Sequence, residues 1–321
     1  MKGLHVVFGA GQVGAGLARR LAAEGHRVRV VRRGTAAVGD GIEVVSANAM
    51  DKAQVIAAAE GAAVLYHCMN PSAYTKEAWE TEFPAFGEAL IAAALAHDAR
   101  LVCLDNLYGY GEVDGPRTEA TPMGANGPKG RVRVAFDARL REARDKDGLR
   151  FVVGRAGDFF GPGAAEQSLM SAKALSGLVG GGRMWLIGDA DASHAFSYVP
   201  DVVRGLAAFG QADADVEGRV FHFPVVLVSP RALVGAVAGA LGATPRATAL
   251  PAWSVRALGV VVPLFAQLRE TLYQWDRPFL VDDSAFRARF PGLATDLATA
   301  AAGIAADVRA MSPLAAAPVG A

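Results

Sequence analysis

Residues 4–14 read Leu-His-Val-Val-Phe-Gly-Ala-Gly-Gln-Val-Gly, an apolar run followed by Gly-x-Gly-x-x-Gly. The β-branched run predicts a buried strand that enters a tight turn and then a helix. In such a turn Gly9 allows the sharp bend, Gly11 lets phosphates approach the backbone, and Gly14 permits close helix–strand packing. The helix N-terminus that follows attracts anions. We therefore expect a dinucleotide-binding turn that uses Gly9, Gly11, Gln12, Val13 and Gly14; a glycine-rich turn without a ligand is the alternative.

The end of the second predicted strand, Val28–Val31, distinguishes the two nicotinamide dinucleotides. An acidic residue there accepts the ribose 2′-hydroxyl of NAD, but Arg32 and Arg33 occupy the place. A guanidinium group pairs with a 2′-phosphate, whereas a carboxylate repels it. We therefore expect NADP as the cofactor, with NAD less favoured. Two arginines that simply end a strand in solvent are the alternative.

Short β-branched runs alternate with alanine-rich helical stretches through the first half of the chain. This pattern is typical of βαβ units, so we expect an α/β fold with a Rossmann-like, doubly wound parallel sheet. The candidate strands are Leu4–Phe8, Val28–Val31, Ile42–Val45, Ala63–His67, Leu101–Leu104 and Phe151–Val153.

The chain changes character after Gly161-Pro162-Gly163, where prolines become more frequent. We expect a dinucleotide-binding domain over 1–160 and a smaller, interleaved substrate domain over 161–194 and 225–312. Residues 195–224 contain two strand-like runs, Phe196–Val199 and Val220–Phe223, which can complete the sheet of the first domain. Residues 313–321 are expected to form a flexible tail.

Charge and cysteine usage restrict the partners. Lys plus Arg and Asp plus Glu each number 32, so no basic field attracts nucleic acid or a membrane surface, and we expect a small-molecule substrate. Only Cys68 and Cys103 occur, and the chain opens without a secretory signal, which predicts a cytoplasmic protein. The six histidines are scattered without metal-ligand spacing, so no metal site is expected.

Five further motifs follow one another in a fixed order: Asn48-Ala-Met-Asp51, Asp105-Asn106-Leu-Tyr108-Gly-Tyr110-Gly111, Ala125-x-x-x-Lys129, Arg155 with Gly161-Pro162-Gly163, and Tyr198-Val-Pro-Asp-Val202. With the glycine turn, they resemble the atypical and extended short-chain dehydrogenases/reductases of the NAD-dependent epimerase/dehydratase family. The resemblance implies that Asn48, Ala49, Asn70, Lys129 and Arg155 contact the cofactor.

The catalytic positions depart from the family pattern. The family uses a Tyr-x-x-x-Lys pair, in which tyrosine transfers the proton, but Ala125 replaces that tyrosine and only Lys129 remains. Asn106 stands where a serine would bind the substrate carbonyl; its amide can donate a hydrogen bond but cannot transfer a proton. Substitute proton donors are Tyr108, Tyr110, the loop residue Tyr74, or Lys129 itself.

The resemblance also suggests where a substrate would bind. Asp158 and Phe159 follow Arg155 on a segment that runs beside the nicotinamide ribose in the family, and Tyr74 lies in a loop beyond a strand end. Ten apolar residues form either a pocket wall or the subunit interface of a homodimer: Trp253, Leu258, Val261, Pro263, Leu264, Phe265, Leu268, Leu272, Tyr273 and Trp275.

These features predict an NADP-dependent oxidoreductase or epimerase that acts on a carbonyl or hydroxyl group of a small, apolar organic molecule. An apolar lining argues against a nucleotide sugar, whose diphosphate requires basic groups. A non-catalytic NADP-binding sensor or regulatory protein is the alternative, because the tyrosine is missing.

Overall fold

Seven strands form the central sheet, in the order β10-β6-β5-β4-β1-β2-β3. The computed structural model describes residues 3–164, 168, 170–179, 181–259 and 267–311. The strands are β1 (Leu4–Phe8), β2 (Arg27–Arg32), β3 (Ile42–Ser46), β4 (Ala62–His67), β5 (Arg100–Asn106), β6 (Phe151–Ala156) and β10 (Arg219–His222). The chain crosses over between β3 and β4, so the expected doubly wound parallel sheet is confirmed.

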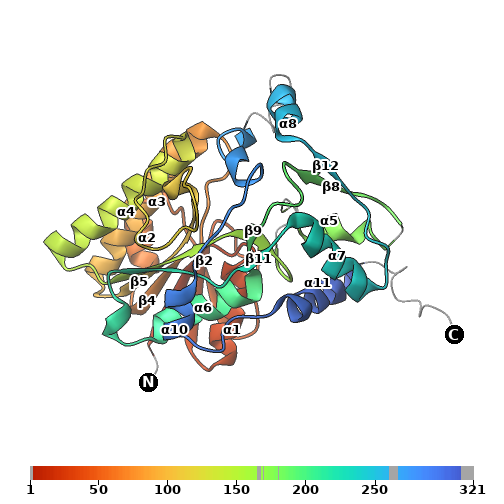
Figure 1. The fold of residues 1–321 in the computed structure, drawn as a ribbon. Helices are drawn as coiled ribbons and strands as arrows, with labels where there is room; N and C mark the ends of the chain where they lie inside the picture. The colour runs from red at the N-terminus through yellow and green to blue at the C-terminus, as the bar shows by residue number, and fades with distance from the viewer. Residues whose placement is uncertain (1–2, 165–167, 169, 180, 260–266, 312–321) are drawn as a thin grey trace. The chain divides into compact units, whose positions relative to one another are not determined.

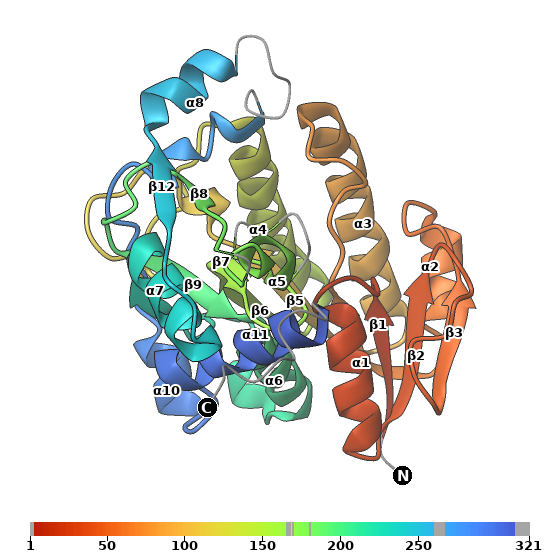
Figure 2. The ribbon, with the colours of Figure 1, turned by 90° about the vertical axis from the view of Figure 1, so that its right-hand side faces the viewer.

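The chain divides into two compact units. The first comprises Met1–Gly111, Glu119–Arg155 and Val202–His222, and the second comprises Glu112–Thr118, Ala156–Asp201 and Phe223–Ala321. Helices α1 (Gly14–Ala23), α2 (Lys52–Ala58), α3 (Lys76–Ala96) and α4 (Pro128–Asp147) belong to the first unit with the short 3-10 helices η1 (Tyr108–Tyr110) and η2 (Ala214–Val216). Helix α6 (Val199–Gln211) begins in the second unit and continues in the first. Figures 1 and 2 show the elements of both units.

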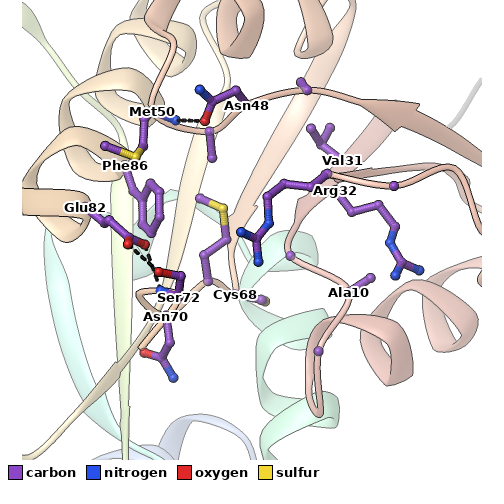
Figure 3. Close-up of a pocket in the computed structure, with 17 residues that line it drawn as sticks. Ala10, Val31, Arg32, Asn48, Met50, Cys68, Asn70, Ser72, Glu82 and Phe86 are labelled. Atoms are coloured by element: carbon purple, nitrogen blue, oxygen red, sulfur yellow. Dashed lines mark hydrogen bonds between the residues drawn. The ribbon is translucent and has the colours of Figure 1, made fainter. Parts of the chain in front are cut away.

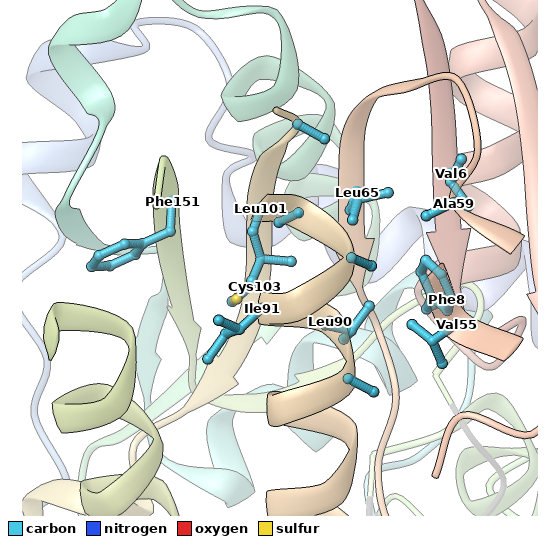
Figure 4. Close-up of a cluster of buried hydrophobic side chains, with 14 of the residues drawn as sticks. Val6, Phe8, Val55, Ala59, Leu65, Leu90, Ile91, Leu101, Cys103 and Phe151 are labelled. Carbon is cyan, nitrogen blue, oxygen red and sulfur yellow. The ribbon is translucent and has the colours of Figure 1, made fainter. Parts of the chain in front are cut away.

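The core of the first unit lies between the sheet and one helical layer. Buried residues such as Phe8 of β1, Leu65 of β4 and Leu101 of β5 pack against α2 and α3, as Figure 4 shows. Helix α3 contributes Leu90 and Ile91 to this cluster, which extends to residues of α4. This packing fixes the carboxyl ends of β1, β4 and β5, and the loops that leave those ends carry the candidate site.

The second unit contains two small sheets. One has the order β11-β9-β7, formed by β7 (Asp158–Phe160), β9 (His194–Tyr198) and β11 (Val226–Val228); the other pairs β8 (Met184–Ile187) with β12 (Ala247–Leu250). Its helices are α5 (Ala172–Ser176), α7 (Pro230–Leu241), α8 (Ala252–Leu258), η3 (Leu272–Gln274), α10 (Ser284–Arg289) and α11 (Leu297–Met311).

The two segments expected to complete the central sheet join two different sheets. Strand β10 pairs in parallel with β6, so the Val220–Phe223 run joins that sheet with its boundary shifted by one residue. Residues 196–198 of the Phe196–Val199 run instead lie in β9, which pairs with β7 and β11, and Val199 begins α6. Both runs are apolar and buried, so their local sequence could not show which sheet each would join. In the described ranges, no helix is long and apolar enough to cross a membrane.

Candidate active site

The glycine turn after β1 is built for close backbone contact. Gly9 has φ 99°, and a methyl group added to it would lie 2.7 Å from the carbonyl oxygen of Cys68. A methyl group on Gly14 would lie 1.9 Å from the carbonyl oxygen of Gly9. A methyl group on Gly11, by contrast, would meet no protein atom within 4 Å. The fold itself therefore requires Gly9 and Gly14, whereas the open space at Gly11 fits the approach of a pyrophosphate.

A pocket of about 460 Å³ opens at this turn (Figure 3). It is lined by the turn and by the segments that follow β2, β3 and β4, together with two residues of α3: Gly9, Ala10, Gly11, Val31, Arg32, Arg33, Gly34, Ala47, Asn48, Ala49, Met50, Cys68, Met69, Asn70, Ser72, Glu82 and Phe86. Seven of the residues expected to contact a cofactor therefore share one cavity. Five other residues expected to contact the cofactor are not among the described residues that line the pocket: Gln12, Val13, Gly14, Lys129 and Arg155.

The two arginines lie on the wall of this pocket. Arg32 ends β2 and is half-buried, while Arg33 is exposed; in the described part of the chain neither forms an ion pair with a carboxylate. Arg32 donates a hydrogen bond to the carbonyl of Ala36 at 3.4 Å, a long contact that a stronger acceptor can replace. The end of β2 therefore presents positive charge, without an acidic side chain, to the pocket.

The last residue of β4, directly before the segment that lines the pocket, is a buried histidine. His67 is fully buried, its ring packs against Phe83 and Phe136, and its Nδ1 accepts a hydrogen bond from the backbone N–H of Met69 at 3.3 Å. Burial, assisted by the nearby charge of Arg133, lowers the pKa of His67 to about 3. A neutral His67 is thus part of the support for the loop that carries Met69 and Asn70.

Acid should unfold the protein partly through His67. Its folded pKa of about 3 lies below the ordinary histidine pKa of 6.5, so its contribution to stability is complete above pH 6.5 and is lost as the pH falls toward 3. Each pH unit in this window should cost about 1.4 kcal/mol of unfolding free energy. Urea unfolding at pH 7, 6 and 5 measures the slope, and His67→Gln should flatten it; an unchanged slope in the variant would contradict the assignment.

Two tyrosines and a lysine meet at the carboxyl end of the sheet. The Tyr74 and Tyr108 hydroxyl oxygens are 3.1 Å apart, and the Nζ of Lys129 lies 4.3 Å from the centre of the Tyr74 ring. Tyr74 comes from the loop after β4, Tyr108 begins η1 after β5, and Lys129 is buried in the first turn of α4. An ammonium group over an aromatic face is attracted by the ring and favours negative charge on a nearby oxygen.

Asn106 holds the segment that carries Tyr108. Its side-chain oxygen accepts a hydrogen bond from the backbone N–H of Tyr108 at 3.0 Å, which leaves the side-chain NH₂ as its donor group. The last residue of β5 therefore fixes the start of η1. The same side chain can offer a hydrogen bond to a substrate oxygen.

Tyr110 belongs to a different group. It is 1% exposed; its hydroxyl accepts a hydrogen bond from Arg155 at 2.7 Å and lies 2.6 Å from Nε2 of His222. The direction of the hydrogen bond between this hydroxyl and the ring nitrogen depends on the tautomer of His222. Burial raises the pKa of Tyr110, and the opposing effect of Arg155 does not cancel this.

Arg155 and Arg133 form a buried charge cluster around Asp105 of β5. Arg133 lies 2.9 Å from one carboxylate oxygen of Asp105, and Arg155 lies 3.3 Å from the other. Arg155 also contacts Asp137 at 2.7 Å, and Arg133 donates to the side-chain oxygen of Asn70 at 3.1 Å. Burial lowers the pKa of Arg133, an effect that Asp105 opposes. Two arginines and two aspartates thus balance one another, and the cluster reaches the pocket through Asn70.

The expected substrate residues Asp158 and Phe159 lie in β7 of the second unit. A carboxylate oxygen of Asp158 is 2.7 Å from Nε2 of His194, whose Nδ1 lies 3.0 Å from the carbonyl oxygen of Gln274. The ring of His194 stacks on Trp275 at 4.2 Å. A carbonyl oxygen only accepts, so Nδ1 of His194 carries a proton.

The late apolar residues are described only in part. Leu272 is buried and Trp275 packs beside His194, while Trp253 is 70% exposed. Val261, Pro263, Leu264, Phe265 and the side chain of Leu258 lie outside the described residues.

Residues 5–223 match the family model for the NAD dependent epimerase/dehydratase family. The chain belongs to the NAD-dependent epimerase/dehydratase family. This confirms the resemblance inferred from the motifs. The protein thereby belongs to a family of enzymes that use a nicotinamide cofactor, and the pocket at its glycine turn fits such a group.

Solved structures of similar fold include two family enzymes. The dTDP-glucose 4,6-dehydratase of Streptomyces venezuelae, with NAD and TYD bound, has a TM-score of 0.75 and 19% identity, covering 97% of this chain and 99% of that one. The UDP-glucose 4-epimerase of Thermotoga maritima, with UDP-glucose, has a TM-score of 0.79 and 13% identity, covering 96% of this chain and 100% of that one. At these identities the likeness shows the fold.

A curated relative is the 3beta-hydroxysteroid-dehydrogenase/decarboxylase isoform 2 of Arabidopsis thaliana. It is 22% identical over 197 residues, which are 56% of this chain and 34% of the relative. The chain therefore matches about a third of the length of that protein.

The pocket of this epimerase/dehydratase family member also contains residues that the motifs did not reveal. Ser72, Glu82 and Phe86 line the pocket, although no motif marked them. Arg133 follows Lys129 by four residues, which places both on one face of a helix, and this spacing was a usable signal. Glu82 and Phe86 share the same spacing on α3, but an alanine-rich helix offers many such pairs.

Proposed function

We propose that the protein is an NADP-dependent oxidoreductase or epimerase, in which the hydroxyl pair of Tyr74 and Tyr108 transfers the proton with the help of Lys129. The observation that carries the proposal is the 3.1 Å contact between the two hydroxyl oxygens beside the lysine ammonium group. Ala125, at the position of the usual tyrosine, has no titratable group.

Within the pair, the hydroxyl of Tyr74 donates a hydrogen bond to that of Tyr108. A phenol hydroxyl can transfer its proton to a substrate oxygen that replaces one of its hydrogen-bond partners. A substrate oxygen that takes this proton leaves a phenolate, which the neighbouring hydroxyl and the Lys129 ammonium group stabilise. A nicotinamide cofactor held at the glycine turn would supply or accept the hydride.

Tyr110 is a weaker candidate for this role. Its hydroxyl is buried, accepts from Arg155 and is hydrogen-bonded to His222, so a substrate would have to replace a contact within the buried network. We assign Tyr110 and Arg155 a positioning role for β5 and η1, and Asn106 the role of hydrogen-bond donor to the substrate oxygen.

Removing either hydroxyl of the pair should slow the reaction. Tyr74→Phe and Tyr108→Phe should each lower kcat by about tenfold, because the remaining hydroxyl still transfers the proton less efficiently. NADPH consumption measures this against a panel of apolar ketones, UDP-glucose and dTDP-glucose. Tyr110→Phe is the comparison: if it alone abolishes turnover while both other variants stay active, the pair is not the proton donor.

We assign Arg32 and Arg33 to the 2′-phosphate of NADP. Similar structures were solved with NAD bound, so the preference for NADP rests on these two arginines, which stand at the end of β2 in place of an acidic residue.

NADP should bind about tenfold or more tightly than NAD, because a charged contact to phosphate is worth about 1.5–3 kcal/mol. Arg32→Ala combined with Arg33→Ala should remove the difference and leave NAD binding unchanged. Calorimetric titration with both cofactors measures it. Arg27→Ala, at the other end of β2, is the control; equal affinities in the wild type would refute the assignment.

We further propose a small, uncharged and largely apolar substrate that contacts Tyr74 in the first unit. Asp158 and Phe159 of the second unit are proposed separately as substrate contacts, and the partly exposed carboxylate of Asp158 would repel the diphosphate of a nucleotide sugar. The sensor alternative gains no support from the enzymes to which the chain is similar. A homodimer and a cytoplasmic location remain part of the proposal.

A further inference from the structure

The cofactor pocket contains a carboxylate that its expected ligand does not explain. Glu82 lines the cavity that the glycine turn and the two arginines prepare for phosphates. A negative side chain there would repel a phosphate, so its partner must be a hydrogen-bond donor. In the described part of the chain Glu82 forms no ion pair that would neutralise it.

The carboxylate is held in a fixed orientation. Its Oε2 accepts a hydrogen bond from the backbone N–H of Ser72 at 2.7 Å, and its Oε1 accepts one from the Ser72 hydroxyl. Each oxygen keeps a second lone-pair direction for another donor. Glu82 is therefore an oriented acceptor on the wall of the pocket.

The arrangement of the pocket indicates which part of the ligand Glu82 meets. Figure 3 shows Glu82 and Ser72 on the same side as Phe86 and Met50, with Arg32 and Ala10 on the opposite side. The turn residues take the pyrophosphate and the end of β2 takes the ribose. The apolar surfaces of Met50 and Phe86 remain for a flat base.

We propose that Glu82, held by Ser72, accepts the exocyclic amino group of the cofactor's adenine and so selects an adenine dinucleotide. This rests on the proposed cofactor site. Asn48 can complete the recognition, because its side-chain oxygen accepts from the backbone N–H of Met50 at 3.1 Å and its NH₂ is left as a donor. Adenine offers an amino donor beside a ring-nitrogen acceptor, whereas hypoxanthine reverses both groups.

The test compares NADPH with its deamino analogue, nicotinamide hypoxanthine dinucleotide phosphate, by calorimetric titration without substrate. The wild type should bind NADPH about tenfold more tightly, because the analogue presents an acceptor to the carboxylate. Glu82→Gln should bring the two affinities within about twofold, since an amide can turn either its oxygen or its NH₂ toward the base. Ser72→Ala should reduce the preference partially, because the carboxylate is no longer oriented.

Glu88→Gln is the matched control, because Glu88 is exposed on the same helix, pairs with Arg139 at 2.8 Å and does not line the pocket. It should keep the wild-type preference. Equal wild-type affinities, or a Glu82→Gln variant that keeps the tenfold difference, would overturn the role of Glu82 while leaving the cofactor site intact. A wild type that binds neither dinucleotide would overturn the proposed function as well.

Discussion

Replacing Gly11 by valine should abolish binding of NADP and NAD while the protein stays folded. A Cβ atom added at Gly11 would meet no protein atom within 4 Å, so the side chain begins in open space, yet it would occupy the path of the pyrophosphate. We expect at least about a hundredfold loss of affinity, or about 2.7 kcal/mol. NADPH fluorescence titration measures binding, and circular dichroism with thermal unfolding checks the fold.

Variants of two other glycines distinguish loss of the fold from loss of cofactor contact as the reason for lost binding in Gly11→Val. Gly14→Ala should destabilise the protein severely, because the new methyl group would lie 1.9 Å from the carbonyl oxygen of Gly9. Gly239→Val, in α7 of the second unit, meets nothing within 4 Å and should leave cofactor binding unchanged. A Gly11→Val protein that still binds NADPH at the wild-type affinity would show that the turn has no role in holding the cofactor.

Replacing Lys129 by methionine should lower kcat by about a hundredfold or more. The variant keeps the length and the buried stem of the side chain but loses the charge that stabilises a phenolate at Tyr74. The affinity for NADP should fall less, because the residues lining the pocket do not include Lys129. Initial rates of NADPH oxidation with a substrate from the carbonyl panel give kcat, and calorimetry gives the affinity.

The control for Lys129 lies on the same helix. Lys146 is 69% exposed and pairs with Glu142 at 2.7 Å, so Lys146→Met should retain wild-type turnover. If Lys129→Met also works at the wild-type rate while the tyrosine variants are inactive, the lysine has only a structural role.

Local sequence predicted the parts of the fold that depend on neighbouring residues. The run Leu4–Phe8 coincides with β1, and the Gly-x-Gly-x-x-Gly motif predicted the turn because Gly9 and Gly14 each stand where a side chain would clash. Strands β7 and β9 could not be paired in advance, because the choice of sheet is made by contacts distant along the chain.

The candidate site was predictable in its residue types and not in its contacts. The motif Ala125-x-x-x-Lys129 showed that the usual proton donor was missing, and the sequence left Tyr74, Tyr108, Tyr110 and Lys129 open as substitutes. Only the structure brings the hydroxyl of Tyr74 to that of Tyr108, 34 residues away, and commits Tyr110 to Arg155 and His222. Glu82 was missed because its orientation depends on Ser72, ten residues earlier in a loop.

The charge cluster around Asp105 implies that two parts of one site respond differently to ionic strength. Asp105, Arg133 and Arg155 are buried, so mobile ions cannot enter to screen their attractions. Arg33 is exposed at the end of β2, where added salt competes for its charge. Potassium chloride at cellular concentrations would therefore weaken the attraction between Arg33 and the phosphate of a bound ribose. It would leave unchanged the positions that β5 gives to Asn106 and Tyr108.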